Sequence, residues 1–296
     1  MGYGLPPWGF EGRAIYQLQL VKSKEARKYI PDDLKLVEMF GYTLGGFYLA
    51  RYTNSPVGVF DELVVLGGLV WNPPTSCAWA ARVYVSNKEA RNHGLKHVGL
   101  PSRFAKFHLL DDSEEETNNA STQKNNRGTW WSRDQSASSS MDSVTVTNLE
   151  RRRIFGKQRG LKPPVCTFVM KEEKGGWKGP RIKMFLPSFS GCTPECPKMV
   201  KYSLELNTNV RPISSVHLEL HDDEDDDVNG SNEFMTKVLS GKPVLSLSFE
   251  NMQMLVDPPE EMEKSVETVT SRAVQPAVKE TPASFSLFGF LRRRSA

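Results

Sequence analysis

The fold of this chain is decided between Phe40 and Arg103, by the segments YTLGGFYLA (42–50), FDELVVLGGLVW (60–71) and AWAARVYV (78–85). These segments are rich in β-branched and aromatic residues, which favour the pleated, half-buried surface of a sheet. Turn formers separate them, with Asn-Ser-Pro at 54–56 and Asn-Pro-Pro at 72–74. Apolar runs of this kind, with single polar residues set inside them, predict a sheet that encloses a cavity.

Outward from this stretch, a period-two pattern predicts strands along much of the chain. They cover residues 13–21, 166–171, 181–186, 200–207, 212–220 and 244–256. Two short helices are expected, one over 24–30 with Ser23 as its cap and one over 87–94, where Ser86 and Glu89 form a capping box. Many strands, few helices and no βαβ rhythm predict a mainly β fold, an antiparallel barrel that is closed or nearly closed.

The composition narrows the class of protein. With 296 residues, 39% of them hydrophobic, the chain can bury one good core. The formal net charge of +3 is small and the basic residues are spread out, so nucleic acid is not an expected partner. Four cysteines are too few for a secreted disulfide scaffold of this length, which favours a reducing compartment.

Two segments lack apolar periodicity. Residues 111–155 are expected to be a disordered insertion within a single domain that spans 1–257, and residues 258–296 a disordered tail. The tail ends in an apolar patch, FSLFGFL (285–291), followed by three arginines, a pattern that favours weak contact with an anionic membrane surface. No run approaches the roughly 18–20 apolar residues of a transmembrane segment.

The cysteines and histidines resemble a zinc motif but do not predict a metal site. Cys192 and Cys196 precede His217 and His221 by about twenty residues. The two histidines alternate with apolar residues of a strand-like run, however, so they would lie roughly 13 Å apart, too far to bind one ion together. Ser188 lacks the Gly-x-Ser-x-Gly context of a hydrolase, and no glycine loop suits a phosphate. We expect no metal and no cofactor.

A more specific candidate for chemistry is a carboxyl group on an apolar strand. Glu62 shares a face with Val64 and further apolar residues, so its pKa would be raised unless a cation lies near. Arg13, at the head of the first strand, is the natural candidate for that cation, and Arg82 and Arg103 are others. The simpler interpretation is a structural ion pair at the mouth of the barrel.

The segment SPVGVFDE (55–62) resembles the Ser-x-x-Gly-x-Tyr-x-Glu segment of the acetoacetate decarboxylase superfamily. Arg13 follows FEG (10–12) in the manner of that family's early arginine, and residues 24–36 resemble its helix followed by Val-Pro-x-x-Leu. The resemblance covers the first hundred residues and implies a cone-shaped antiparallel β fold with a buried cavity. The candidate cavity residues are then Arg13, Glu62, Arg82, Ser102 and Arg103.

One departure from this superfamily concerns the reaction itself. Its decarboxylases form a Schiff base through the first lysine after a Tyr-Pro pair. In this chain Leu100-Pro101 is followed by Ser102 and Arg103. Serine cannot form an imine, and arginine is never appreciably neutral. The resemblance therefore predicts the fold without a catalytic residue of the decarboxylase kind.

Longer blocks are similar to the plant neoxanthin-deficient family: GRAIYQL (12–18), EMFGYTLGGF (38–47), FDELVV (60–65), WNPPTSCAWAAR (71–82) and LPSFSG (186–191). This resemblance implies a part in making neoxanthin from violaxanthin, and hence in supplying abscisic acid, as an accessory protein rather than as the enzyme. It implies a hydrophobic isoprenoid or xanthophyll ligand and a protein partner in xanthophyll synthesis. The role implies the chloroplast, whereas the N-terminus does not resemble a transit peptide and implies the cytoplasm.

Two other functions stay open on the residues alone. One is an enzyme, an isomerase or lyase, with Glu62 as acid or base and Arg13 or Arg103 holding an anion. The other is an adaptor with an inert barrel, which recruits partners through residues 111–155 and the tail.

Overall fold

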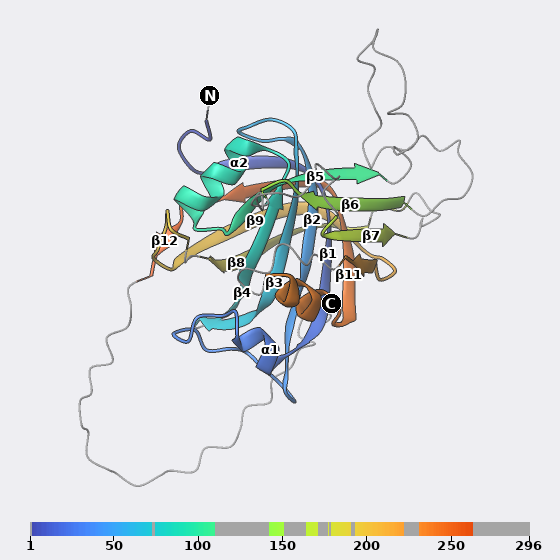
Figure 1. The fold of residues 1–296 in the computed structure, drawn as a ribbon. Helices are drawn as coiled ribbons and strands as arrows, with labels where there is room; N and C mark the ends of the chain where they lie inside the picture. The colour runs from blue at the N-terminus through green and yellow to red at the C-terminus, as the bar shows by residue number, and fades with distance from the viewer. Residues whose placement is uncertain are drawn as a thin grey trace, which may run out of the picture. The chain divides into compact units, whose positions relative to one another are not determined.

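The computed structural model of the protein describes residues 2–72, 75–109, 142–150, 164–170, 177, 179–190, 193–221 and 231–262. These residues belong to one compact unit, Met1–Met262. Strands dominate it and the helices are short (Figure 1), so the predicted mainly β fold is confirmed.

The elements extend most of the predicted segments by a few residues. The strands are β1 (Trp8–Lys22), β2 (Tyr42–Asn54), β3 (Phe60–Asn72), β4 (Thr75–Val85), β5 (Ser102–Leu109), β6 (Asp142–Asn148), β7 (Cys166–Met170), β8 (Arg181–Ser190), β9 (Val200–Pro212), β10 (His217–Leu220), β11 (Lys242–Val256) and β12 (Glu260–Glu261). The helices are α1 (Ser23–Arg27), α2 (Lys88–His93), the π-helical turn η1 (Gly94–Val98) and α3 (Ser231–Leu239).

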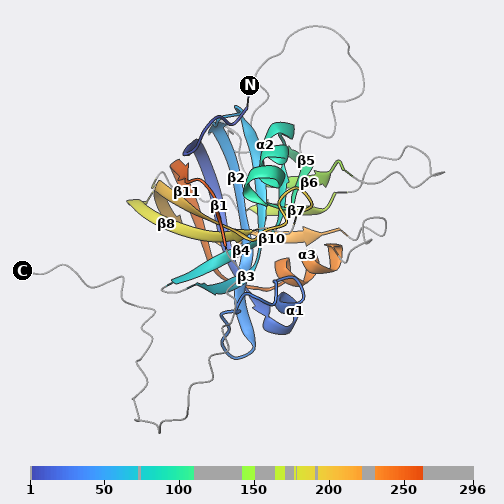
Figure 2. The same cartoon turned by 90° about the vertical axis from the view of Figure 1, so that its left-hand side faces the viewer.

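The strands form one mixed sheet in the order β10-β7-β6-β5-β4-β3-β2-β1-β11-β9-β12. β8, at the left of Figure 2, lies off this path. It pairs with both β9 and β4. The prediction of an entirely antiparallel barrel is wrong, because β4 pairs in parallel with β5 and with β8. Closure into a cone is not confirmed either, since the path has open ends and β4 meets β8 over only two residue pairs.

The parallel pair of β4 and β5 has a local cause. Parallel neighbours need a crossover connection, and here α2 and η1 provide it, between Val85 and Ser102. The helix α2 is capped by Asn87 rather than by the predicted capping box: the Asn87 side chain accepts hydrogen bonds from the backbone N–H groups of Glu89 and Ala90, at 2.8 and 3.1 Å. Ser86 instead accepts one from the backbone of Asp61.

The predicted disordered insertion, 111–155, contains a strand. β6 pairs with β5 and β7, and its residues Val144 and Val146 are fully buried. Two valines alternating with polar residues over seven positions give too short a signal to stand out beside a long polar segment. Residues 111–141 and 151–155 of that insertion, and the tail beyond Met262, lie outside the described residues. Residues 260–261 of the tail form β12, which pairs with β9.

Two apolar cores lie on opposite faces of the central strands. On β2, Phe47 and Leu49 face the first core, which also holds residues of α3, β6 and β7. The alternate residues of β2, such as Tyr52, face the second core, which includes Trp8 and Phe10. The candidate site lies on this second face.

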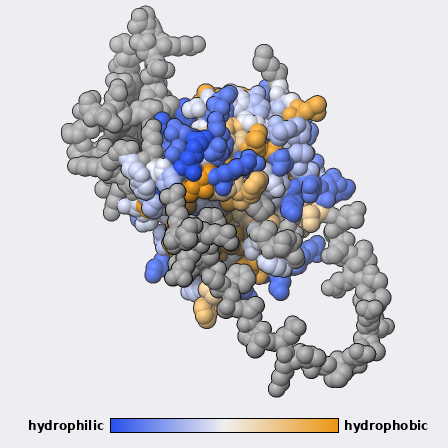
Figure 3. Space-filling model, turned by 180° about the vertical axis from the view of Figure 1, so that it is seen from behind, coloured by the Kyte–Doolittle hydropathy of each residue, from blue (hydrophilic) through white to orange (hydrophobic). Residues whose placement is uncertain are grey.

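Large apolar side chains also lie at the surface, the most exposed being Leu5 and Phe40, each with an exposed fraction of 91%. On the face shown in Figure 3, apolar residues gather near the centre, with hydrophilic residues around them. No helix in the described part of the chain is long and apolar enough to span a bilayer.

Candidate functional site

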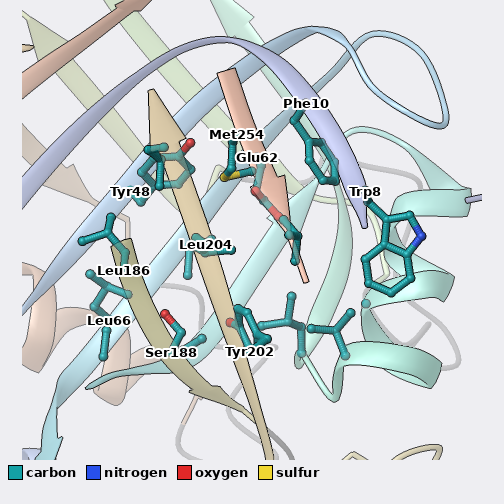
Figure 4. Close-up of a pocket in the computed structure, with 18 of the residues that line it drawn as sticks. Trp8, Phe10, Tyr48, Glu62, Leu66, Leu186, Ser188, Tyr202, Leu204 and Met254 are labelled. Atoms are coloured by element: carbon teal, nitrogen blue, oxygen red, sulfur yellow. The ribbon is translucent and has the colours of Figure 1, made fainter. Parts of the chain in front are cut away.

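A cavity of about 290 Å³ lies on the second face of the sheet, lined by β1, β2, β3, β4, β5, β8, β9 and β11 and by the α2–η1 crossover. Most of its wall is apolar (Figure 4), with contributions from Phe10, Leu66, Leu69, Ala78, Leu186 and Leu204. Few polar groups reach it, and they come mostly from tyrosine, serine, His93 and Glu62. Apolar walls with a few convergent polar groups are the usual composition of a small-molecule site.

Glu62 supplies the carboxyl group of the cavity. It alternates with Asp61 and Leu63 on β3, so the strand turns its side chain to the cavity while its neighbours face away. Burial raises the pKa of Glu62 to about 7, and a 2.8 Å hydrogen bond from Tyr52 Oη opposes this rise. The carboxyl group therefore changes its protonation state near neutral pH.

Tyrosine hydroxyls surround this carboxyl group. Tyr52 Oη lies 3.5 Å from Tyr48 Oη, and Tyr48 Oη lies 3.2 Å from Met252 Sδ. Burial raises the pKa of Tyr48 and of Tyr52 well above the ordinary tyrosine value, and the negative charge of Glu62 raises both further. These phenols are neutral at physiological pH and act as hydrogen-bond donors.

Three rings form one wall of the cavity. His93 stacks on Tyr3 with a centroid distance of 3.7 Å, and Trp8 meets His93 edge-on at 4.4 Å. Burial, with help from the neighbouring His97, lowers the pKa of His93 to about 4, so its imidazole is neutral. Its Nε2 atom is buried and makes no hydrogen bond to any described residue.

Comparison with known proteins identifies the family. A protein named NEOXANTHIN-DEFICIENT 1 from Solanum lycopersicum is 39% identical over 283 residues, which cover 88% of this chain and 93% of that protein. Proteins of the same name from Arabidopsis thaliana and Oryza sativa subsp. japonica are 39% and 40% identical, over 87% of this chain and 94% and 90% of their own length. The chain belongs to the NEOXANTHIN-DEFICIENT 1 family. No protein-family model matches it.

Solved structures place this NEOXANTHIN-DEFICIENT 1 family member in a wider fold group. It matches an acetoacetate decarboxylase with a TM-score of 0.54 and 13% identity, over 90% of this chain and 93% of that one. An acetoacetate decarboxylase from Legionella pneumophila gives 0.52 and 14%, over 90% and 91%. The enduracididine biosynthesis enzyme MppR gives 0.52 and 13%, over 88% and 89%. At such low identity these matches show a shared fold and nothing about activity.

The structure brings together two of the five cavity residues predicted for this NEOXANTHIN-DEFICIENT 1 family member. Glu62 and Ser102 line the cavity, whereas Arg13, Arg82 and Arg103 are not among its lining residues. The expected cation beside Glu62 is therefore replaced by the hydroxyl of Tyr52. Arg13 lies 3.8 Å from Glu250 instead, with 43% of its side chain exposed.

Ser102 occupies a confined position in the wall. It is 4% exposed, and a methyl group added to Gly94 would lie 2.5 Å from its Oγ atom. The glycine thus lets η1 pack directly against the serine hydroxyl. Among the described residues, no lysine or arginine lines the cavity, so the wall offers a carboxyl group and hydroxyls but no amine.

The sequence analysis did not predict several residues that line the cavity of this NEOXANTHIN-DEFICIENT 1 family member. Tyr48 and Tyr52 could have been found, because both share the face of β2 opposite to Phe47 and Leu49. The stack of Tyr3 on His93 could not, because these residues lie ninety positions apart and no local pattern joins them.

Proposed function

We propose that this protein is an accessory protein in neoxanthin biosynthesis, and that its cavity binds the ring end of a xanthophyll or related isoprenoid. One observation carries the proposal: an apolar cavity has a single carboxyl group, Glu62, and no amine among the described residues that line it. The name of the 39%-identical relatives points to neoxanthin biosynthesis as the pathway. Their high coverage of this chain supports a shared role.

The size and polarity of the cavity favour a ring end over a whole xanthophyll. Its volume of about 290 Å³ lies at the lower limit of ligand pockets, which span roughly 300–1,000 Å³. A ring with a hydroxyl group could place that group beside Glu62 and its methyl groups against Leu66 and Leu204. Because no cation faces the cavity from the described wall, a carboxylate ligand would lack a partner for its charge.

An accessory role follows from the residue at position 102. Chemistry through an imine requires an amine that is neutral near pH 7. In the resemblance to acetoacetate decarboxylases, the position of that amine is occupied by Ser102, whose hydroxyl is confined. Incubation with a keto acid followed by borohydride should therefore leave the mass of the protein unchanged. A stable mass increase on any lysine would contradict the proposal.

Ligand binding tests the proposal directly. Trp8 lines the cavity, so titration with violaxanthin or neoxanthin should quench tryptophan fluorescence to saturation. Glu62→Leu should weaken binding by about twofold to tenfold, because one lost hydrogen bond contributes roughly 0.5–1.5 kcal/mol. Glu11→Leu, which alters an exposed residue of β1, is the control and should bind as the wild type does. Absence of saturable quenching by either xanthophyll would remove the ligand from the proposal.

A second function is favoured by the titration of Glu62. A carboxyl group whose pKa is about 7 is suited to donate and accept a proton at neutral pH, as an isomerase or lyase requires. On the accessory proposal, purified protein incubated with violaxanthin yields no product in excess of a boiled control. Turnover that Glu62→Gln abolishes would replace the accessory proposal with this one.

A further inference from the structure

The apolar wall of the cavity continues onto an open part of the sheet. Tyr16 and Tyr48 line the cavity and lie opposite each other on β1 and β2. The pairing then runs on without a shift, through Leu18 with Gly46, Leu20 with Leu44, and Lys22 with Tyr42. Since alternate residues of a strand share a face, the side chains of these pairs lie on the cavity side of the sheet.

The flanking strands extend the same surface. On β3, Leu69 lines the cavity, and Trp71 follows it on the same face, opposite the lining residue Ser76. On β11, Leu245 lies opposite Leu18. We call this surface the apolar trough; its members are Leu18, Leu20, Tyr42, Leu44, Trp71 and Leu245.

Several side chains of the trough reach the surface. Trp71, Tyr42 and Leu245 are 38%, 40% and 42% exposed, and neither of the two cores of the described chain includes Leu18, Leu20 or Leu44. β8 covers the cavity but meets β4 over only two residue pairs, and its lining residue Phe185 is 63% exposed. The wall is therefore incomplete beside β8.

One glycine deepens the floor of the trough. Gly46 has a φ of 137°, and a methyl group placed on it would lie 2.0 Å from the carbonyl oxygen of Gln17. Only glycine fits this conformation and this close approach. Gly46 pairs with Leu18 of β1 on one side and with Leu66 of β3 on the other. Because it has no side chain, it leaves a gap between these two leucines.

The ends of this surface differ in chemistry. Glu62 pairs with Ala50 at the cavity end, and the exposed lysines Lys22 and Lys242 lie at the other end, opposite Tyr42 and Leu20. From Ala50 to Tyr42, the strand advances about 26 Å at roughly 3.3 Å per residue. This length exceeds that of a lone ring and suits an extended chain.

We propose that the cavity and the apolar trough together bind one long, linear isoprenoid, with a ring end beside Glu62 and the polyene chain along the trough. The inference rests on the proposed function and adds the mode of binding. A hydrocarbon chain is the occupant that this surface fits, because the trough is continuous with the cavity and presents aliphatic and aromatic side chains. A peptide strand has no edge to join along β1, which is paired with β2 and with β11 as far as Leu20.

Two substitutions on one strand test the trough. Leu245→Glu places a carboxylate in the trough, whereas Leu255→Glu places one on the opposite face of β11 at a similar exposure, 42% against 45%. Each variant is titrated with two probes, neoxanthin as the long ligand and β-ionone as a single ring with a short chain. Leu245→Glu should weaken neoxanthin binding by about tenfold or more, since it sets a charge against an apolar chain. It should leave β-ionone binding unchanged, and Leu255→Glu should affect neither probe.

The outcomes separate this inference from the proposed function. If the wild type binds neither probe, the proposal that the cavity binds a xanthophyll is wrong, and so is the proposal that the trough binds its chain. If the wild type binds neoxanthin and Leu245→Glu binds it equally well, the trough is overturned while the proposed function stands. A wild-type dimer that Leu245→Glu dissociates would assign this surface to a second copy of the chain. Binding to phosphatidylcholine vesicles without xanthophyll, lost in the same variant, would assign it to a membrane; either result overturns the proposal.

Discussion

Phe47→Ala is expected to lower the free energy of unfolding by about 3–5 kcal/mol, the usual effect of removing a buried phenyl ring. Phe47 is fully buried on the central strand β2, and its ring meets that of Phe168 with centroids 4.9 Å apart at 61°. The pair joins the central strands to β7 on the far side of the first core. Because whole domains are stable by only about 5–15 kcal/mol, this variant should be close to unfolding at 37 °C.

Urea unfolding followed by circular dichroism measures this change. Tyr42→Ala removes an aromatic ring from the same strand at a site that is 40% exposed, and should cost less than about 1 kcal/mol. A double-mutant cycle with Phe168→Ala should give a coupling of about 0.5–1.5 kcal/mol for the edge-to-face contact. Equal destabilisation by Phe47→Ala and Tyr42→Ala would contradict the packing described for the first core.

The stability of the wild type is expected to fall, relative to Glu62→Gln, by up to about 3 kcal/mol between pH 4.5 and pH 7. Burial raises the pKa of Glu62 from its ordinary value of 4.5 to about 7. In this window the folded protein holds a proton that the unfolded chain has released. The stabilising effect is therefore complete below pH 4.5, decreases as the pH rises, and is lost above pH 7.

Unfolding midpoints of the wild type and Glu62→Gln, measured at pH 4, 5, 6, 7 and 8, test this linkage. The difference in stability between the two proteins should change across the window and be constant outside it. Glu11→Gln removes an exposed carboxyl group of β1 and is the matched control. Its stability relative to the wild type should not show the change between pH 4.5 and pH 7 that is expected for Glu62→Gln. Parallel curves for wild type and Glu62→Gln would show that Glu62 is solvated and that the cavity is wet.

The sequence predicted the strands because their apolar periodicity is strong. β1, β2, β3, β4 and β11 carry long runs with the alternation of a half-buried strand. It missed β5 because Ser102–Leu109 contains arginine, lysine and histidine among its apolar residues, and propensity in such a mixed segment is a weak signal. Without β5, the parallel crossover through α2 was not foreseeable.

The site was predictable in part for similar reasons. The apolar neighbours of Glu62 were sufficient to predict burial and a raised pKa. Whether each arginine faces the cavity depends on how the strands pair, and no local sequence pattern contains that information. A shift in the pairing of β3 with β4, between Ala80 and Arg82, breaks the alternation that would have set Arg82 on the face of Ala80. Arg103 follows the lining residue Ser102 and so faces away from the cavity.

The pairing of β1 with β11, from Trp8 with Val256 to Leu20 with Lys242, has a consequence for biosynthesis of the chain. β1 can pair with β2 soon after both strands have left the ribosome, but its second partner, β11, emerges only after most of the chain has been made. At roughly 5–20 residues per second, that interval is on the order of 10–50 s. During it, β1 presents an unpaired edge of apolar residues, the kind of surface that aggregates. Chaperones that hold nascent chains should therefore determine how much native protein a cell obtains, and deleting β11 should yield insoluble protein.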